Sequence, residues 1–398
     1  MNFLALKDMD LENKKVLVRV DYNVPIKNGI VEDDTRLKAT IPTINFLLEK
    51  NCKIILMSHL GRPQKEIKKG KNLQEIKKEL TLKPVAEDLS EILGVEVGFA
   101  EDCINIELPK DKDIILLENL RLHKEEQENN KEFAKKLAKN GEIYVNDAFG
   151  ASHRAHASVE AITKFLPSYA GCLVEKEIKQ LSKLLTPEKP FIVIIAGTKA
   201  DKIGALKLLT KKADKILVAG VLANTFLKAK GIDIAASKFD EETFHIAKEL
   251  IKIIGKKLIL PEDVIVADTF NNEAETTVVN ISEIPKDWMA LDVGPQTIES
   301  YKTELKTAKT VLWAGPLGVF EMEKFSQGTK QIGEFLANLN ANVIVGGGDT
   351  IAAIQSFNLT EKMTYVSTGG GASLEFVEKE GKLPALIALE NYYKTKQE

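Results

Sequence analysis

The chain has 398 residues, 44% of them apolar, which is long for a single core and suits two domains. A formal net charge of −3 argues against a nucleic-acid or membrane-surface partner, because bulk attraction to polyanions is missing. Three scattered cysteines without a CxxC pair, a start unlike a signal peptide and no apolar run near about 18 residues predict a soluble cytoplasmic protein.

Short β-branched apolar runs alternate with amphipathic segments along the chain. In the first half these predict strands at 15–20, 53–57, 95–99, 113–117 and 142–145, with helices such as 34–50, 84–93 and 131–139 between them. In the second half the runs PFIVII, KILVA, KLIL, TVLW, NVIV and TYVS are likewise separated by segments such as 203–211 and 327–339. Near-continuous apolar strands joined by helices indicate parallel sheets covered on both faces. The predicted fold class is α/β, with two Rossmann-like three-layer α/β/α domains whose sheets are mainly parallel.

A hinge helix is predicted where the two domains join. The segment VEKEIKQLSKLL has apolar residues at helical spacing and ends in TPEKP, whose prolines stop a helix. We therefore expect an N-terminal domain over 1–172, a connecting helix and hinge over 173–190, and a C-terminal domain over 191–376.

Arginine is rare, with five arginines against fifty lysines, and all five precede residue 155. The planar guanidinium of arginine has five N–H donors and can bond two oxygens of a phosphate or carboxylate at once, which the ammonium of lysine cannot. These positions therefore predict an anion site. Several polar residues directly follow predicted strands: Asp21, Asn23, His59, Arg62, Asn119, Arg121, Asp147 and Arg154. The carboxyl ends of parallel strands form the ligand crevice of such sheets, so these side chains should converge.

Two of the arginines have structural alternatives. Arg19 lies inside the strand VLVRV, and we expect it to be a structural, paired arginine, since buried charges need partners. Arg36 opens a helix behind Asp33 and Asp34, which could be ordinary capping and dipole compensation. A cation at a helix start is locally unfavourable, however, so a functional role is favoured for Arg36.

Glycine-rich turns dominate the second half. The strand 342–345 runs into Gly346, Gly347, Gly348, Asp349 and Thr350 and then a helix, and the pattern recurs at Gly369 to Gly371. A glycine-rich helix start presents backbone N–H groups to phosphate, and Asp349 could hold a Mg²⁺ that bridges phosphate oxygens. One such turn can equally be a tight structural turn, whereas two after neighbouring strands favour a polyphosphate ligand.

Further strand-end residues complete the predicted second site. AGTKADK places Lys199 and Lys202 after a strand, although any one lysine here could be an ordinary solvated side chain, and Glu321 in GPLGVFE could accept ribose hydroxyls. No Walker loop and no HRD or DFG motif is present. Two anion sites joined by a hinge suggest phosphoryl transfer. Catalysis of this reaction consists mainly of positioning the substrates and neutralising the charge of the transferred group, which cations and helix starts can do. No general base stands out, which suggests an acceptor that is already ionised.

The segments VRVDYNVP, DDTR, SHLGRP, ENLR, NDAFGASHRAHAS, LANTFLKA, LDVGP, GPLGVFE, GGGDT and STGGGASLEF together resemble the phosphoglycerate kinase family, in order, from about residue 14 onward. The resemblance implies a monomeric glycolytic and gluconeogenic phosphotransferase with a carboxyl group as acceptor. It would interconvert 1,3-bisphosphoglycerate plus ADP with 3-phosphoglycerate plus ATP, with Mg²⁺ as cofactor and only small molecules as partners. It also implies that the tail, residues 377–398, returns to the N-terminal domain.

The resemblance assigns roles residue by residue. In the N-terminal domain it implies a 3-phosphoglycerate site made of Asp21, Tyr22, Asn23, Arg36, His59, Leu60, Gly61, Arg62, Arg121 and Arg154. In the C-terminal domain it implies nucleotide ligands at Lys199, Lys202, Glu321, Gly347, Gly348, Asp349 and Thr350, with Asp349 on the metal. The residues implied to act on the transferred group are Arg36, Lys199, Gly348 and Gly371.

Three departures from the family pattern concern the nucleotide side. AGTKADK is one residue shorter than the usual GGAKVxDK, so either lysine could play either role; Ala314 replaces the asparagine of WNGP; and AGVLANTF replaces GGGMANTF. We expect the reaction to survive with nucleotide affinity or preference altered. The competing readings are an NAD-dependent dehydrogenase, which lacks its GxGxxG fingerprint here, and a non-catalytic two-domain phosphosugar or nucleotide sensor.

Overall fold

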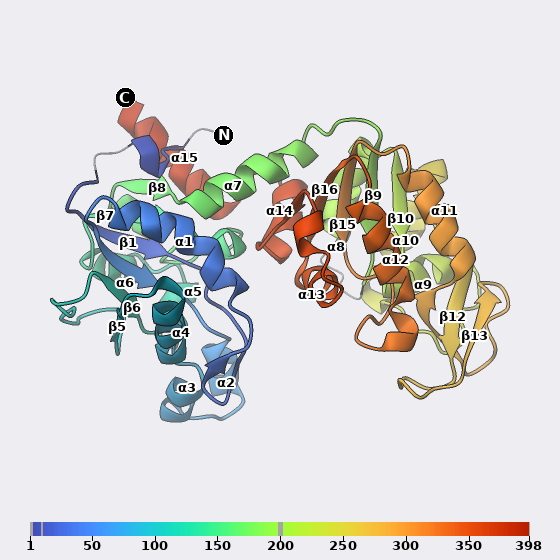
Figure 1. Ribbon diagram of the computed structural model, residues 1–398, viewed down its shortest axis with the longest axis horizontal. Helices are drawn as coiled ribbons and strands as arrows, with labels where there is room; N and C mark the ends of the chain where they lie inside the picture. The colour runs from blue at the N-terminus through green and yellow to red at the C-terminus, as the bar shows by residue number, and fades with distance from the viewer. Residues whose placement is uncertain (1–2, 9–10, 198–201, 398) are drawn as a thin grey trace. The chain divides into compact units, whose positions relative to one another are not determined.

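The computed structural model describes residues 3–8, 11–197 and 202–397 (Figure 1). The chain forms two compact units, one of residues 1–179 with 381–398 and the other of residues 180–380. The described part of each unit is built on one six-stranded sheet whose neighbouring strands are all parallel. This is the α/β class expected from the alternation of apolar runs and amphipathic segments.

The sheet of the first unit separates two apolar layers. Along β1, Val16 and Val18 point into one core and Leu17 into the other, as the two-residue period of a strand requires. Helices α1 (Thr35–Leu48) and α4 (Lys83–Leu93) supply side chains to the first core, and α6 (Lys131–Ala138) to the second. The strand order is β5 (Val97–Ala100), β6 (Ile114–Leu117), β4 (Lys53–Met57), β1 (Lys15–Arg19), β7 (Ile143–Asn146), β8 (Ser168–Ala170).

The first unit also contains most of the short elements. Its helices are α1 (Thr35–Leu48), α2 (Pro63–Lys68), α3 (Leu73–Glu79), α4 (Lys83–Leu93), α5 (Lys124–Gln127) and α6 (Lys131–Ala138), with 3₁₀ turns η1 (Leu6–Asp8), η2 (Leu120–Leu122), η3 (Phe149–Ala151) and η4 (Ala161–Lys164). A small hairpin pairs β2 (Ile26–Lys27) with β3 (Ile30–Val31).

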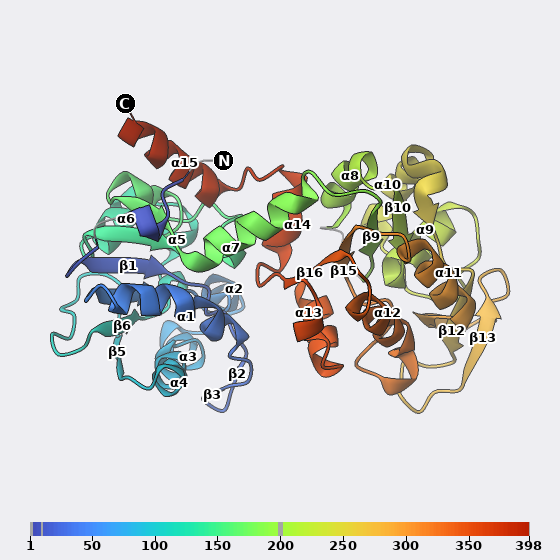
Figure 2. The same cartoon turned by 45° about the horizontal axis from the view of Figure 1, so that its top comes forward.

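The last helix, α15 (Pro384–Gln397), belongs to the first unit and lies beside β8 (Figure 1), and Figure 2 shows the same helix from another side. The backbone N–H of Ala385 donates to the carbonyl of Ser152 at 3.1 Å, and the rings of Tyr169 and Tyr392 lie 6.2 Å apart. The unit boundary falls inside α7 (Cys172–Leu181), which is followed by η5 (Ser182–Leu184).

The second unit repeats the three-layer plan. Its strand order is β11 (Leu258–Ile259), β10 (Lys215–Val218), β9 (Phe191–Ile195), β15 (Thr310–Ala314), β16 (Asn342–Gly346), β17 (Tyr365–Val366). Trp313 and Val345 point into a core shared with α11 (Pro295–Leu305) and α12 (Gln327–Ala337). The helices are α8 (Lys202–Lys212), α9 (Gly220–Ala229), α10 (Glu241–Ile254), α11 (Pro295–Leu305), α12 (Gln327–Ala337), α13 (Gly348–Ser356) and α14 (Gly371–Glu378), with η6 (Gly255–Lys257), η7 (Glu323–Phe325) and η8 (Thr360–Lys362).

An antiparallel sheet in the second unit was not expected from the sequence. It consists of β13 (Thr276–Asn280), β12 (Asp263–Ala267) and β14 (Met289–Val293), in that order. β13 is largely exposed, so it lacks the continuous apolar run that identified the buried strands. Among the described residues, no helix combines the length and apolar character that crossing a bilayer would require.

Candidate active site

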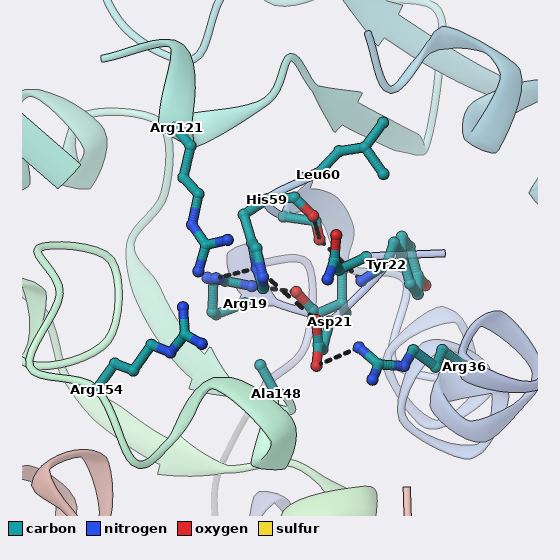
Figure 3. Close-up of polar contacts among 12 residues, drawn as sticks. Arg19, Asp21, Tyr22, Arg36, His59, Leu60, Arg121, Ala148 and Arg154 are labelled. Carbon is teal, nitrogen blue, oxygen red and sulfur yellow. Dashed lines mark hydrogen bonds and ion pairs between the residues drawn. The ribbon is translucent and has the colours of Figure 1, made fainter. Parts of the chain in front are cut away.

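Four loops of the first unit place polar side chains at one edge of its sheet. The strands β6, β4, β1 and β7 are consecutive neighbours, and all run in the same direction. Each is followed by a loop that carries predicted site residues, so these loops share the carboxyl edge. Figure 3 shows Asp21, His59, Arg121 and Arg154 gathered there, with Arg36 entering from α1.

Arg36 and Asp21 form an ion pair at this edge. Arg36 Nη1 donates to Asp21 Oδ2 at 2.7 Å, and about a third of the arginine side chain is exposed (33%). Asp21 Oδ1 has no hydrogen-bond partner among the described residues although it is buried. The ion pair holds the remaining N–H donors of Arg36 beside the unpaired Oδ1 of Asp21. A ligand with an anionic group and a hydroxyl could bond to both, the anionic group to Arg36 and the hydroxyl to Asp21.

Arg121 is a buried cation with unused donors. Only 2% of the residue is exposed, and Nη1 donates to the carbonyl of Gly61 at 2.7 Å. Its Nε and Nη2 have no partner among the described residues. Burial, followed by the charges of Arg154 and Arg19, lowers the pKa of Arg121 to about 9. Leaving buried guanidinium donors unpaired beside other cations costs free energy. Binding of an anionic ligand next to Arg121 would remove this cost, so the site favours such a ligand.

Three histidines line the same edge. Burial and the nearby charge of Arg19 lower the pKa of His59 well below its ordinary value. Burial and the charge of Arg121 lower the pKa of His156 to about 3. Arg154 Nε donates to His153 Nε2 at 3.0 Å. His59 and His156 are therefore neutral near pH 7 and can donate to an anion without adding charge.

Asparagine side chains hold the loops that carry these groups. Asn23 Oδ1 accepts from the N–H of Gly61 at 2.8 Å, and Asn119 bonds both the N–H and the carbonyl of Leu60, at 3.0 and 2.8 Å. Asn119 Oδ1 also accepts from the N–H of Arg121 at 3.1 Å. The loops after β1, β4 and β6 are thus tied together by the half-buried amide of Asn23 and the buried amide of Asn119.

Two of the residues predicted to bind substrate, Tyr22 and Leu60, have side chains that are buried in the protein. The Tyr22 ring is fully buried in the core, and its hydroxyl bonds Thr40 Oγ1 at 2.7 Å. Leu60 is also buried, so both can offer a ligand mainly backbone groups. Arg62, in contrast, is exposed at the start of α2.

A pocket of about 680 Å³ lies in the second unit. Its walls combine apolar side chains, such as Phe270 and Leu291, with Glu321 and Asp349. The full lining is Gly197, Gly220, Val221, Ala236, Lys238, Phe270, Met289, Ala290, Leu291, Pro316, Gly318, Val319, Phe320, Glu321, Met322 and Asp349. An apolar slot with a few polar groups at its rim is typical of a site for a planar ring carrying polar substituents.

Two glycine-rich turns lead into helix starts in this unit. Gly347 (φ +95°) precedes α13, and Gly370 (φ +54°) precedes α14, both in the left-handed region that favours glycine. A Cβ added at Gly348 or Gly371 would meet no atom within 4 Å, so open space lies at these positions. Backbone N–H groups at such helix starts can receive phosphate oxygens.

Thr350 has a structural role in the described fold. Its buried hydroxyl accepts from the N–H of Gly315 at 2.6 Å and donates to the carbonyl of Gly346 at 3.0 Å. The side chain therefore joins the loops after β15 and β16, and its hydroxyl is already engaged. Lys199 lies outside the described residues, and of Lys202 only the backbone, at the start of α8, is described.

Asp349 is suited to a hard cation. It is exposed in the first turn of α13 and lines the pocket, so its carboxylate could share a Mg²⁺ with ligand phosphates. Within the described ranges, the one group of three potential metal-ligating side chains is elsewhere, at Asp102, Cys103 and His123 of the first unit. A single carboxylate plus phosphate oxygens and water fits Mg²⁺, which keeps most of its waters.

Comparison with known proteins identifies the family. The family model described as phosphoglycerate kinase matches residues 6–381. The chain belongs to the phosphoglycerate kinase family. A phosphoglycerate kinase of Moorella thermoacetica is 47% identical over 397 residues, covering 97% of this chain and 98% of the relative. That of Dictyoglomus turgidum is 46% identical over 400 residues, covering 98% of each.

Solved structures of phosphoglycerate kinases have the same fold. The enzyme from Coxiella burnetii superposes with a TM-score of 0.85 at 40% identity, covering 99% of this chain and all of the other (100%). The enzyme from Pyrococcus horikoshii OT3 superposes with a TM-score of 0.86 at 31% identity, covering 98% and 99%. The resemblance stated from the sequence motifs and the α/β fold class are therefore confirmed, and this chain is a phosphotransferase with a carboxyl acceptor.

Sequence reasoning missed several residues that lie beside the arginine cluster or line the pocket of the second unit. Ser158 and Glu126 lie behind the arginines, and no strand-end position marks them. The apolar lining of the pocket, including Phe270 and Met289, was also missed. Phe270 is a large exposed apolar side chain in a polar loop, which is the signal that could have indicated it.

Proposed function

We propose that this phosphoglycerate kinase interconverts 1,3-bisphosphoglycerate plus ADP with 3-phosphoglycerate plus ATP, in glycolysis and gluconeogenesis, with one substrate bound on each unit. The observation that carries the assignment of substrates is the pairing of two different sites. The first unit holds a cluster of arginines in which the buried Arg121 has two unused donors, and the second holds glycine-rich helix starts beside an apolar pocket.

The first unit is proposed to bind 3-phosphoglycerate. The phosphate would occupy the space bordered by Arg121, Arg154 and His59, with Arg62 closing it from α2. Two unpaired donors on a buried Arg121 support this, because a phosphate would satisfy both with charge-assisted hydrogen bonds. Asp21 and Asn23 would orient the hydroxyl end, and Tyr22, Leu60 and Gly61 would supply backbone groups.

The second unit is proposed to bind the nucleotide. The base would enter the apolar pocket, and Glu321, exposed at its rim, would accept from the ribose hydroxyls. The N–H groups at Gly347, Gly348 and Thr350 would meet phosphates, with Lys199 and Lys202 neutralising their charge. Asp349 would hold Mg²⁺, which when bound supplies positive charge shared between phosphate oxygens.

The transfer needs no general base on the protein. The acceptor is the carboxylate of 3-phosphoglycerate, which is already ionised near pH 7. The carboxylate of Asp21 in the arginine cluster is paired to Arg36 through Oδ2, and we assign its other oxygen to orienting the substrate hydroxyl rather than to proton transfer. Arg36, Lys199 and the N–H groups of Gly348 and Gly371 would instead stabilise charge on the group in flight.

The proposal also covers the roles of the two units, the hinge between them, the oligomeric state and the compartment. The two units would act as an N-terminal 3-phosphoglycerate domain and a C-terminal nucleotide domain, joined by the helix and hinge of residues 173–190 and with the tail returning to the first. We propose a cytoplasmic monomer that acts on small molecules, with Mg²⁺ as its metal.

A coupled assay tests the function. Purified protein is given 3-phosphoglycerate and MgATP, and formation of 1,3-bisphosphoglycerate is followed through reduction by an added dehydrogenase and NADH. We expect turnover that is abolished by a chelator in excess of Mg²⁺ and restored by adding Mg²⁺ back. Ligand binding without turnover at saturating substrate would instead describe a sensor.

A further inference from the structure

Arg19 is buried beneath the arginine cluster and is not used by the proposed reaction. None of the residue is exposed, and its guanidinium makes three contacts. Nε donates to Ser158 Oγ at 2.9 Å, Nη1 donates to the carbonyl of Val20, and Nη2 lies 3.0 Å from His59 Nδ1 (Figure 3). A buried arginine without a directly bonded carboxylate suggests a role other than a simple ion pair.

The contact with His59 fixes which ring nitrogen carries the proton. A guanidinium has five N–H donors and no acceptor, so Nδ1 must accept from Nη2. The alternative, a proton on Nδ1 directed at Asp21 Oδ1, is disfavoured because those atoms are 3.7 Å apart. An imidazole that accepts at Nδ1 and is neutral carries its proton on Nε2.

The electrostatics around the ring favour the neutral form. The charged groups that face His59 include Arg19 of β1, Arg36 of α1, Arg121 of η2 and Arg154 of the loop after β7, and the carboxylate of Asp21 lies 3.7 Å from Nδ1. Burial, then Arg19, contributes most to the lowered pKa of His59. A second proton on this ring would be placed beside four cations.

The guanidinium itself is held rigidly. Ser158 Oγ donates to Glu126 Oε1 at 2.6 Å, so the same oxygen must accept from Arg19 Nε. The N–H of Ser158 donates to Glu126 Oε2 at 2.9 Å, and Glu126 is fully buried. The buried carboxylate thus offsets the charge of Arg19 through one hydroxyl and orients the donor aimed at His59.

We propose that Arg19 is a positioning residue that holds His59 as the neutral Nε2–H tautomer, so that Nε2 serves as a hydrogen-bond donor for the phosphate of the substrate. This rests on the proposed function of the site. Nε2 makes no hydrogen bond to another described residue, so its N–H is available to a ligand. Arg19 would therefore act on the substrate through His59 without contacting it.

The tautomer is measured directly by NMR of full-length protein labelled with ¹⁵N in its histidine rings, without substrate, between pH 6 and 8. We expect His59 to be neutral with its proton on Nε2 across this range. In Arg19→Met we expect the Nδ1–H or doubly protonated form to appear, and in Arg19→Lys, which keeps a donor and a charge, the wild-type pattern. His123, which bonds Asp102, is the internal control and should not change. A wild-type ring protonated on Nδ1, or an Arg19→Met spectrum identical to wild type, would overturn the proposal.

A double-mutant cycle separates positioning from the loss of a positive charge. In the wild-type background Arg19→Met should raise KM for 3-phosphoglycerate about tenfold, the value of one hydrogen bond to a charged group, with a smaller effect on kcat. In a His59→Ala background it should change KM by less than about twofold, because the group through which it acts is gone. Equal factors in the two backgrounds would show that Arg19 acts by its charge alone. The NMR result needs no activity, so it decides the tautomer even if the coupled assay fails.

Discussion

At the scale of single residues, the five arginines divide by the freedom of their guanidinium groups. Arg19 is fully engaged and buried, Arg121 keeps two unused donors, and Arg36 is one third exposed with one acid as partner. The shared location of Arg62, Arg121 and Arg154 was predictable, because each lies in a loop that follows a strand of the same sheet. The partners of the arginines were not predictable, since hydrogen bonds such as Arg19 to Ser158 join residues 139 positions apart.

Arg36→Lys tests whether fork geometry matters in addition to charge. Lysine keeps the positive charge but cannot bond Asp21 and a transferred group in one plane. We expect kcat to fall by about 100-fold, the typical effect of losing one transition-state donor, while the Kd for MgADP changes less than twofold. Steady-state kinetics and calorimetry measure the two quantities.

The matched control for Arg36→Lys lies on the same helix. Lys38 pairs with Asp34, four positions away, and is well exposed, so Lys38→Ala removes a cation of α1 outside the cluster. It should leave both kcat and the Kd unchanged. A similar loss in Lys38→Ala, or equal losses of kcat and affinity in Arg36→Lys, would count against the role proposed for Arg36.

At the scale of elements, prediction succeeded where burial imposes a continuous apolar run. The predicted strand at 53–57 coincides with β4, and the one at 15–20 is one residue longer than β1. The prediction at 95–99 was displaced from β5 (Val97–Ala100), because Val95 is apolar but exposed. The antiparallel sheet was missed although β12 is mostly buried, because β13 is largely exposed and β14 only partly buried. Tyr22 and Thr350 show that chain position does not tell which way a side chain turns.

Helix α10 depends on the side chain that caps its start. Asp240 Oδ1 accepts from the N–H groups of Glu242 and Thr243, at 3.0 and 3.3 Å. Asp240→Ala should lower the free energy of unfolding of the second unit by about 1 kcal/mol, whereas Asp240→Asn, which keeps an acceptor, should cost only a few tenths. Both tryptophans, Trp288 and Trp313, lie in this unit, so denaturant titration followed by tryptophan fluorescence reports on it. Equal losses would show that the cap bond contributes nothing.

Asp292 in β14 should make the stability of the second unit depend on pH. Burial raises its pKa to about 7, although Val293 and Gly328 donate N–H groups to it at 2.9 and 2.8 Å. Since the folded pKa exceeds the unfolded value, the folded state holds more protons between about pH 4 and 7. The stabilising contribution is thus complete below about pH 4 and is lost as pH rises to 7.

The corresponding measurement compares wild type with Asp292→Asn. Between about pH 4 and 7 the free energy of unfolding of the wild type should fall by up to about 4 kcal/mol relative to that of Asp292→Asn. Above about pH 7 the difference between the two proteins should stay constant. Asparagine does not ionise, so a constant cost from its amide group leaves this slope unaffected. Tryptophan fluorescence across a pH series gives the two curves, and parallel curves would contradict a raised pKa at Asp292.

At the scale of the whole molecule, the proposed function divides two kinds of anion recognition between the two units. The first unit would bind its ligand with arginine side chains at the carboxyl edge of its sheet, and the second with backbone N–H groups at helix starts beside an apolar pocket. All five arginines precede residue 155, so they all belong to the first unit. This uneven distribution along the sequence is what the proposed division would require.

If each unit binds one substrate, substitutions in the two sites should have reciprocal effects. Arg121→Met removes two unpaired buried donors and should weaken 3-phosphoglycerate binding about 100-fold, while MgADP binding stays within about twofold of wild type. Glu321→Gln should weaken MgADP binding about tenfold, by replacing a charged acceptor with a neutral one, and leave 3-phosphoglycerate binding unchanged. Calorimetry with each ligand alone measures all four affinities.

The double variant shows whether the two sites are independent. For each ligand measured alone, the binding free energy that the double variant loses should equal the sum of the losses in the two single variants within about 0.5 kcal/mol. This is expected because Arg121 and Glu321 lie in different units. Circular dichroism at the titration temperature confirms that each variant is folded. Loss of MgADP affinity in Arg121→Met as large as its loss of 3-phosphoglycerate affinity would mean that both ligands share the first unit, and the proposed division of substrates would be wrong.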